Sequence, residues 1–147
     1  LHYPLRRQRQ MCIRDSHCTM VEDGDHLWNC IEHVDLNMVR AGVVSHPIDW
    51  SWCGCRELLG EKTRYCLLDM DRLLELLGKS DVKLFAEEYR GRIEHAIAVG
   101  IFRRERRWTE SIAVGGLQYV TRIAAAVRCE RLRPWIEEAE DGSWSVW

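Results

Sequence analysis

The stretch DHLWNCIEHVDLNMVRAGVV, residues 25–44, decides the fold. Its apolar residues recur at steps of four, three and four, namely Leu27, Ile31, Val34 and Met38. This spacing places them on one face of an α-helix, because residues three and four apart lie above one another there. We therefore expect a single helix from Asp25 to about Ala41, with Gly42 as its C-terminal stop.

Further short helices are expected along the chain. Apolar spacing, with a polar residue before and a glycine after most segments, predicts helices at about 50–59, 70–77, 81–99 and 116–128. Asp69 and Ser80 are the expected caps of the second and third of these. Two short β segments are expected at His17–Glu22 and at Ser143–Trp147, the latter without a partner. The fold class is therefore expected to be mainly α.

The composition fits one soluble globular domain. The chain has 147 residues, 46% hydrophobic and 30% charged, and its 21 Lys and Arg against 23 Asp and Glu argue against a strongly basic nucleic-acid module. No apolar run approaches the roughly 18 residues of a membrane span, so we expect a cytoplasmic protein with no membrane partner. The seven cysteines are odd in number and lack a CxxC pair, which favours reduced thiols over a zinc site or disulfides.

The first sixteen residues, LHYPLRRQRQMCIRDS, carry four arginines and no hydrophobic periodicity. The hexapeptide at 11–16, MCIRDS, resembles translated sequencing-adapter read-through. We therefore expect residues 1–16 to be an artefactual leader or a disordered basic arm. Both interpretations predict that this segment packs against nothing.

Two segments carry a resemblance to a known family. Residues 35–44, DLNMVRAGVV, are followed by His46-Pro47 and by Trp50-Ser51-Trp52. This string resembles the helix Tyr-Ile-x-x-Asn-x-Val-Arg-Ala-Gly, with its following His-Pro and Trp, of the REP-associated tyrosine transposases, single-tyrosine members of the HUH endonuclease group. Residues 107–115, RWTESIAVG, resemble a signature in the C-terminal extension of one branch of that family.

The resemblance implies the rear part of a truncated ferredoxin-like α/β catalytic domain at residues 17–60 and a helical C-terminal extension at 61–147. Members of the family cut and rejoin single-stranded DNA beside short hairpins, so the implied partner is single-stranded or hairpin DNA. A helix-borne tyrosine attacks a phosphodiester. A divalent ion, Mg²⁺ or Mn²⁺, held by a His-hydrophobic-His pair, polarises the phosphate.

Carried onto this sequence, both halves of that chemistry are missing. The tyrosine position falls on His33, and the further metal-ligand position four residues later falls on Asn37. None of the six histidines has another histidine two residues away, so the His-hydrophobic-His pair is absent. We therefore expect a partial transposase that cuts no DNA and binds no divalent metal of its own.

The candidate DNA contacts are cationic and aromatic. Arg40 lies one turn beyond Asn37 and is a candidate phosphate contact. The equally good alternative is a surface cation that is favourable at the C-terminus of the helix because of the helix dipole. A basic run near residue 105 could contact phosphates and stack a base; its candidate residues are Arg103, Arg104, Arg106, Arg107 and Trp108. A solvated loop is the alternative for this run. Trp50 and Trp52 are expected to be packing residues.

Two other functions stay open. One is a non-enzymatic helical module that binds nucleic acid or protein through its arginine-rich segment. The other is a metal-binding helix, because His26, Cys30 and His33 lie at steps of four and three on one polar face. Ligands along one helix face rarely surround an ion, so a solvated face is the simpler interpretation. The oligomeric state is left open.

Overall fold

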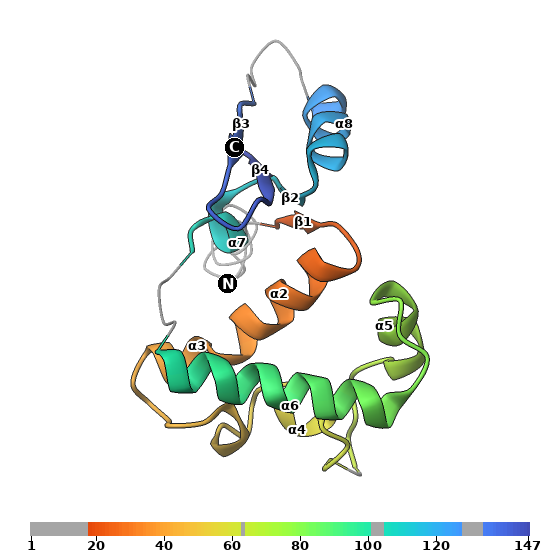
Figure 1. The fold of residues 1–147 in the computed structure, drawn as a ribbon, viewed down its shortest axis with the longest axis vertical. Coiled ribbons are helices and arrows are strands. Elements are labelled where there is room, and N and C mark those ends of the chain that lie inside the picture. Colours follow the sequence, from red (N-terminus) through yellow and green to blue (C-terminus); the bar gives the residue numbers. More distant parts are fainter. Residues whose placement is uncertain (1–17, 63, 101–104, 128–133) are drawn as a thin grey trace, which may run out of the picture. The chain divides into compact units, whose positions relative to one another are not determined.

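The computed structural model describes residues 18–62, 64–100, 105–127 and 134–147 (Figure 1). The described chain is mainly α-helical, as expected, and also contains a small four-stranded sheet. It forms two compact units: unit 1 combines Leu1–Met20 with Glu105–Trp147, and unit 2 is Val21–Arg104. Among the described helices none is both long enough and apolar enough to cross a membrane.

Unit 2 is built from helices. In chain order these are α2 (Asp25–Asp35), α3 (Asn37–Arg40), the 3₁₀ helix η1 (Pro47–Asp49), α4 (Cys55–Leu58), α5 (Met70–Leu76) and α6 (Val82–Val99). The buried residues of the long α6 recur at helical spacing: Phe85, Tyr89, Ile93 and Ala96. They form one core with Trp28 and Leu36 from the first part of the unit and with Leu58 and Leu74 from α4 and α5. α6 is thus the helix around which the unit is organised.

The first helix differs from the expectation in its length and in its buried face. It ends at Asp35, earlier than expected, and Leu36 joins it to the short α3. Val34, expected inward, is 60% exposed, whereas Trp28 is 5% exposed and meets Phe85 edge-on, with 4.9 Å between ring centroids. An indole buries much more apolar area than a valine side chain does. The buried face of α2 is therefore shifted by about one residue along the sequence relative to the face that the apolar spacing predicts.

The helix boundaries follow local cap residues. Asp69 accepts a backbone hydrogen bond of 3.0 Å at the start of α5, as expected. α6 is capped by Asp81 and not by Ser80, because the Asp81 carboxylate accepts hydrogen bonds from two backbone amides of the first turn. It ends at Gly100, whose φ of 71° is a left-handed conformation that favours glycine. Within the helix expected at 50–59, only the single turn of α4 is helical, and the short η1 precedes this region.

Unit 1 contains the sheet. The elements of this part of the chain are β1 (Met20–Val21), α7 (Arg107–Glu110), β2 (Ala113–Gly115), α8 (Leu117–Val127), β3 (Ile136–Glu138) and β4 (Trp144–Val146). The strand order is β1-β2-β4-β3, and β4 is antiparallel to both of its neighbours. α8 packs on the sheet through Val120, which forms a fully buried cluster with Ala113 and Val146.

The sheet corrects the expectation of a helical extension at 61–147, which is helical only in part. Ser143–Trp147, expected to lack a partner, contains β4, which pairs with β2 and β3. Strands of three residues are too short to show an alternating pattern, so nothing in the sequence predicts β2 and β3. The expected helix at 116–128 is confirmed by α8, and β1 lies within the β segment expected at His17–Glu22.

The two units do not follow the boundary after residue 60 that the family resemblance implies. Leu58 of α4 and Leu74 of α5 lie in one core, so both sides of that boundary belong to unit 2. The chain instead divides near residues 20 and 105, which makes unit 2 an insertion between two parts of unit 1. The leader at 1–16 lies outside the described residues, and its lack of packing stays an expectation.

Candidate nucleic-acid interface

The family positions His33, Asn37 and Arg40 meet at the junction of α2 and α3. His33 lies in the last turn of α2, and Asn37 opens α3. The Arg40 guanidinium donates a hydrogen bond to the carbonyl oxygen of His33 at 2.5 Å and a longer one, at 3.5 Å, to the side-chain oxygen of Asn37. Leu36, between the helices, keeps a right-handed backbone with φ −74° and ψ −1°. The structure thus brings the three positions together.

These residues do not fit a divalent ion. Arg40 places a permanent positive charge beside the Asn37 oxygen, which is the atom that would face the ion, and like charges repel. Mg²⁺ and Mn²⁺ bind where several oxygen ligands or substrate phosphates displace their waters together. Nowhere in the described part of the chain do three His, Cys, Asp or Glu side chains gather as a metal site requires.

The polar face of α2 does not gather into a metal site either. His26, Cys30 and His33 are all half-buried residues of α2, and they do not form a group of three ligands. His26 lies 3.8 Å from the Glu22 carboxylate. Burial raises the pKa of the Cys30 thiol, which disfavours the thiolate form that binds metal ions. The hypothesis of a metal-binding helix therefore finds no support in the geometry.

The arginine-rich run is partly used by the fold itself. Arg103 and Arg104 lie outside the described residues. The Arg107 side chain is 11% exposed and pairs with Asp141, at 2.8 Å, and with Glu105. Trp108 is 9% exposed, so its ring cannot stack on a base without leaving the interior of unit 1. The structure gives these two residues a structural role that their spacing in the sequence does not reveal.

Among the residues of this run that the structure describes, Arg106 is the exposed arginine. Its side chain is 72% exposed and pairs with Glu110, one turn later, at 2.7 Å. Its guanidinium carbon lies 5.9 Å from the centre of the Trp147 ring. An ion pair at this exposure contributes little, because water screens it and ordering the two side chains costs entropy. Arg106 therefore stays available as a phosphate contact.

A buried polar cluster that sequence spacing does not indicate links α2, α4 and α6. The Tyr89 hydroxyl donates to one oxygen of Asp35 at 2.5 Å, and the Gly54 amide donates to the other at 3.2 Å. Asp35 is 4% exposed and Tyr89 is 2% exposed. Burial raises the pKa of Asp35, and this effect outweighs the two hydrogen bonds, which lower it. The pKa of Tyr89 is also raised, mainly by burial and next by the nearby charge of Asp35.

The same burial keeps this cluster unreactive. Cys55, beside Tyr89, is completely buried, and desolvation raises the pKa of its thiol to about 11. A thiol and a phenol with raised pKa values are poor nucleophiles at neutral pH. We therefore assign Asp35, Tyr89 and Cys55 to the stability of unit 2 rather than to chemistry.

Exposed aromatic and basic residues lie on α4 and in the two segments that flank it, and we name this set the loop surface. It is formed by exposed residues of α4 itself, of the segments before and after it, and of α6, namely Trp52, Arg56, Arg64, Tyr65, Leu67 and Arg90. Trp52 is 86% exposed, Tyr65 90% and Leu67 87%. Trp52 was expected to be a packing residue, and the structure overturns that expectation, because the turn at 51–54 directs it outward.

The buried carboxylate of Glu57 holds the segment that follows α4. Its side chain is 6% exposed, and one carboxylate oxygen accepts hydrogen bonds from the amides of Leu67, at 2.6 Å, and Leu68, at 2.5 Å. The other oxygen accepts from the Lys62 ammonium at 3.2 Å. The pKa of Glu57 lies below its usual value, mainly because its carboxylate accepts the hydrogen bond from the Leu68 amide. The segment after α4 is therefore held at three points by one carboxylate.

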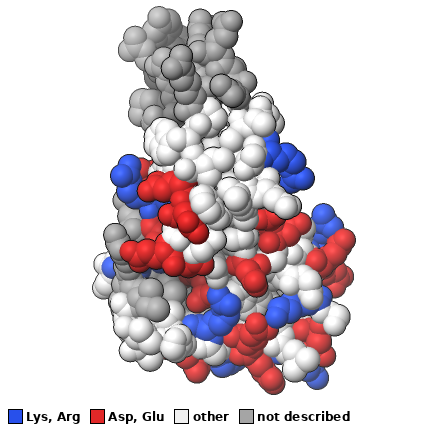
Figure 2. All heavy atoms as spheres, turned by 45° about the horizontal axis from the view of Figure 1, so that its top comes forward, with Lys and Arg blue, Asp and Glu red and all other residues white. Residues whose placement is uncertain are grey.

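Outside the loop surface, unit 2 is acidic. Residues 21–104 contain 15 Asp and Glu against 11 Lys and Arg, and without residues 50–68 the counts are 13 and eight. On the face of the chain shown in Figure 2, acidic and basic side chains are interspersed among uncharged ones. Residues 50–68 differ, with three basic and two acidic residues, and one of the acidic residues is the buried Glu57. The segment around α4 is thus locally basic in an acidic unit.

Comparison of the chain with protein-family models, with curated proteins and with solved structures finds no match.

Proposed function

We propose that the chain is part of a single-tyrosine HUH transposase that binds DNA and does not cut it, with α2 to α4 as the rear of a ferredoxin-like catalytic domain. The observation that carries the proposal is the contact of Arg40 with both His33 and Asn37, because it gathers three family positions at one point. A guanidinium held in a fixed position is a good donor to a phosphate.

The junction of α2 and α3 lacks a group that could cleave a DNA strand. His33 stands where the family has its tyrosine, and an imidazole reaches less far than a phenol. The charge of Arg40 disfavours a divalent ion at Asn37. Without an ion, the negative charge that develops on the attacked phosphate lacks its main stabiliser, which raises the barrier by several kcal/mol. Binding without cleavage follows from these residues.

The test uses the full chain and a labelled single-stranded oligonucleotide flanked by a hairpin. We expect binding that weakens with salt, with a log–log slope of about −0.7 for each phosphate contact on a single strand. Arg40→Ala should weaken binding and reduce the slope by about one contact. Arg72→Ala is the control, because Arg72 is likewise an arginine that pairs within a helical segment, with Glu75 of α5, away from the junction of α2 and α3.

Cleavage is tested in the same samples with Mn²⁺ on a denaturing gel. Neither the native chain nor His33→Tyr should form a covalent protein–DNA adduct, because the nucleophile and the metal site are separate requirements. An adduct in either sample would contradict the absence of cleavage. A folded chain that retains no hairpin DNA at low salt would contradict the DNA-binding function itself.

A protein-binding module without enzymatic activity is the second candidate. The observation that favours it is the acidic balance of residues 21–104, since an acidic surface repels the DNA backbone. Failure to bind DNA at low salt, with the helical circular dichroism intact, would select this function over the first.

A further inference from the structure

We propose that the loop surface binds single-stranded DNA, with Trp52 and Tyr65 as stacking platforms and Arg56 and Arg64 as phosphate contacts. This inference rests on the proposed DNA binding. It locates the contact at a part of unit 2 that neither the family string nor the arginine-rich run indicates.

The exposure of the two rings is the first support. Trp52 is 86% exposed and Tyr65 is 90% exposed, so nearly the whole of each ring faces water. Large aromatic side chains are normally covered, because burying them is strongly favourable. Unpaired bases can cover such rings by stacking, at about 1–3 kcal/mol per base.

The second support is that the surface is held in place before any ligand arrives. Glu57 ties down the backbone amides of Leu67 and Leu68. A Cβ added at Gly54 would lie 3.7 Å from Leu68, so the segments before and after α4 are in contact. A preorganised surface loses less entropy on binding than a mobile loop does.

Tyr65 itself has an unusual backbone. Its φ is 55°, and it is the one non-glycine residue with a positive φ in the described chain. A left-handed conformation is costly for a residue with a Cβ and persists where the surroundings impose it, most often at functional sites. Here it presents a fully exposed ring next to Arg64.

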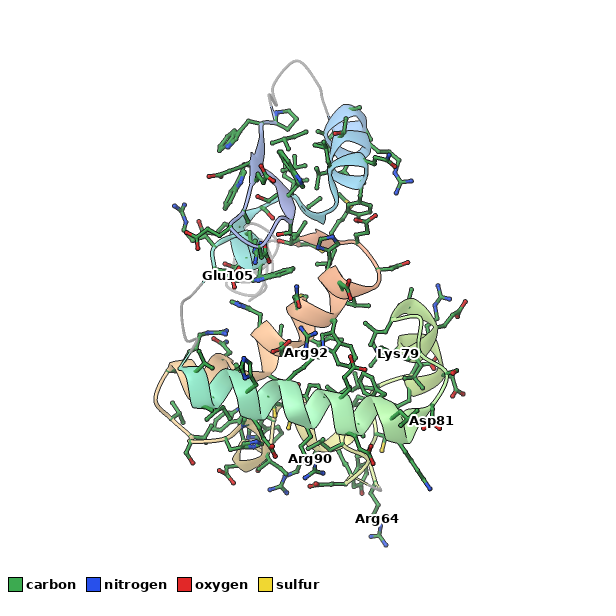
Figure 3. All side chains as sticks on the ribbon, viewed as in Figure 1. Arg64, Lys79, Asp81, Arg90, Arg92 and Glu105 are labelled. Atoms are coloured by element: carbon green, nitrogen blue, oxygen red, sulfur yellow. The ribbon has the colours of Figure 1, made fainter. Side chains whose placement is uncertain are left out.

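The third support is charge. The segment 50–68 is basic within an acidic unit. Arg90 of α6 adds to it, with a side chain that is 52% exposed and loosely paired with Glu61 at 3.4 Å. In Figure 3, Arg64 and Arg90 lie on one side of α6, whereas Arg92 lies on the side of α2, where it pairs with Glu32 at 2.6 Å. Cations interleaved with exposed rings are the pattern of single-strand binding.

The experiment measures binding of a fluorescein-labelled oligothymidine by fluorescence anisotropy at low salt. Trp52→Ala and Tyr65→Gly should each weaken binding about fivefold or more. Glycine adopts a φ of 55° without strain, so the second variant keeps the fold while it loses the ring. Tyr65→Phe keeps the ring and should keep the affinity. Leu84→Ala, 64% exposed on α6, is the control and should change nothing.

Each result decides something. Loss of affinity in Trp52→Ala and Tyr65→Gly, with retention in Tyr65→Phe, supports the inference. Native binding that both variants retain overturns the loop surface as the site and leaves the proposed function standing, which the hairpin DNA tests separately. A chain that binds neither oligothymidine nor hairpin DNA overturns both. Binding that does not weaken with salt also overturns a DNA site and points to an apolar protein contact.

Discussion

Replacing Tyr89 with phenylalanine removes one oxygen from the centre of unit 2 and leaves the ring in place. The ring keeps its stacked contact with Phe85, with 6.1 Å between centroids. The hydrogen bond to Asp35 is lost, and Asp35, at 4% exposure, cannot turn to water for a replacement. A hydrogen bond to a charged group is worth about 1.5–3 kcal/mol. We therefore expect Tyr89→Phe to lower the free energy of unfolding by about 2–3 kcal/mol near neutral pH.

The size of this loss should depend on pH in a definite direction. The folded protein raises the pKa of Asp35 above 3.8, so the contribution of this carboxyl to stability is greatest below its unfolded pKa and is lost as pH rises through its folded pKa. The hydrogen bond from Tyr89 lowers the pKa of Asp35, and its removal raises the pKa further. The loss caused by Tyr89→Phe should therefore grow as pH rises through this window.

Urea denaturation followed by far-ultraviolet circular dichroism measures both effects, at about pH 4, near the unfolded pKa of an aspartate, and at about pH 8. Tyr65→Phe is the matched control, because its hydroxyl is in water, and its free energy should change by less than about 0.5 kcal/mol. A loss for Tyr89→Phe as small as that of the control would refute the buried hydrogen bond. A loss that is larger at the lower pH would refute the assignment of the charge to Asp35.

Four further changes test other parts of the chain. Glu57→Ala should lower the melting temperature more than Glu57→Gln, because glutamine keeps an oxygen for the loop amides and alanine keeps none. Val34→Asp should leave the free energy of unfolding within about 0.5 kcal/mol of the native value in urea, since the side chain is 60% exposed. Arg107 lowers the pKa of Asp141, so Asp141→Asn should reduce stability above about pH 4 and matter less as pH falls below it, in a denaturation series against pH. Deleting residues 1–16 should leave the melting temperature unchanged.

Local sequence signals predict the ends of several helices because those signals act within one turn. Asp69 caps α5, and Gly100 ends α6, as their residue types indicate. Apolar periodicity also predicts that residues 25–35 are helical. It does not predict which face is buried, since the position of Trp28 is decided by Phe85, which is remote in sequence.

Long-range pairing explains what the sequence could not predict. β2 and β3 have three residues each and exist because β4 pairs with both. Asp35 and Tyr89 are 54 residues apart, and no spacing rule connects them. Of the candidate site, helical spacing predicts that His33, Asn37 and Arg40 lie together, and the resemblance gives them their expected roles. The exposure of Trp52 follows from the turn at 51–54, and the segment around Leu67 is held by Glu57; only the folded structure reveals both.

The discontinuity of unit 1 has a consequence for the order of assembly during synthesis. Thr19 donates its hydroxyl hydrogen to the carbonyl oxygen of Ser111, 92 residues later, at 2.7 Å. Everything between 21 and 104 leaves the ribosome as one continuous unit, and a domain that is continuous can fold as it emerges. The sheet, in contrast, must wait for β4 at 144–146. Closing a folded insertion costs less entropy than closing a flexible loop of the same length, so translation favours formation of the helical unit first and of the sheet last.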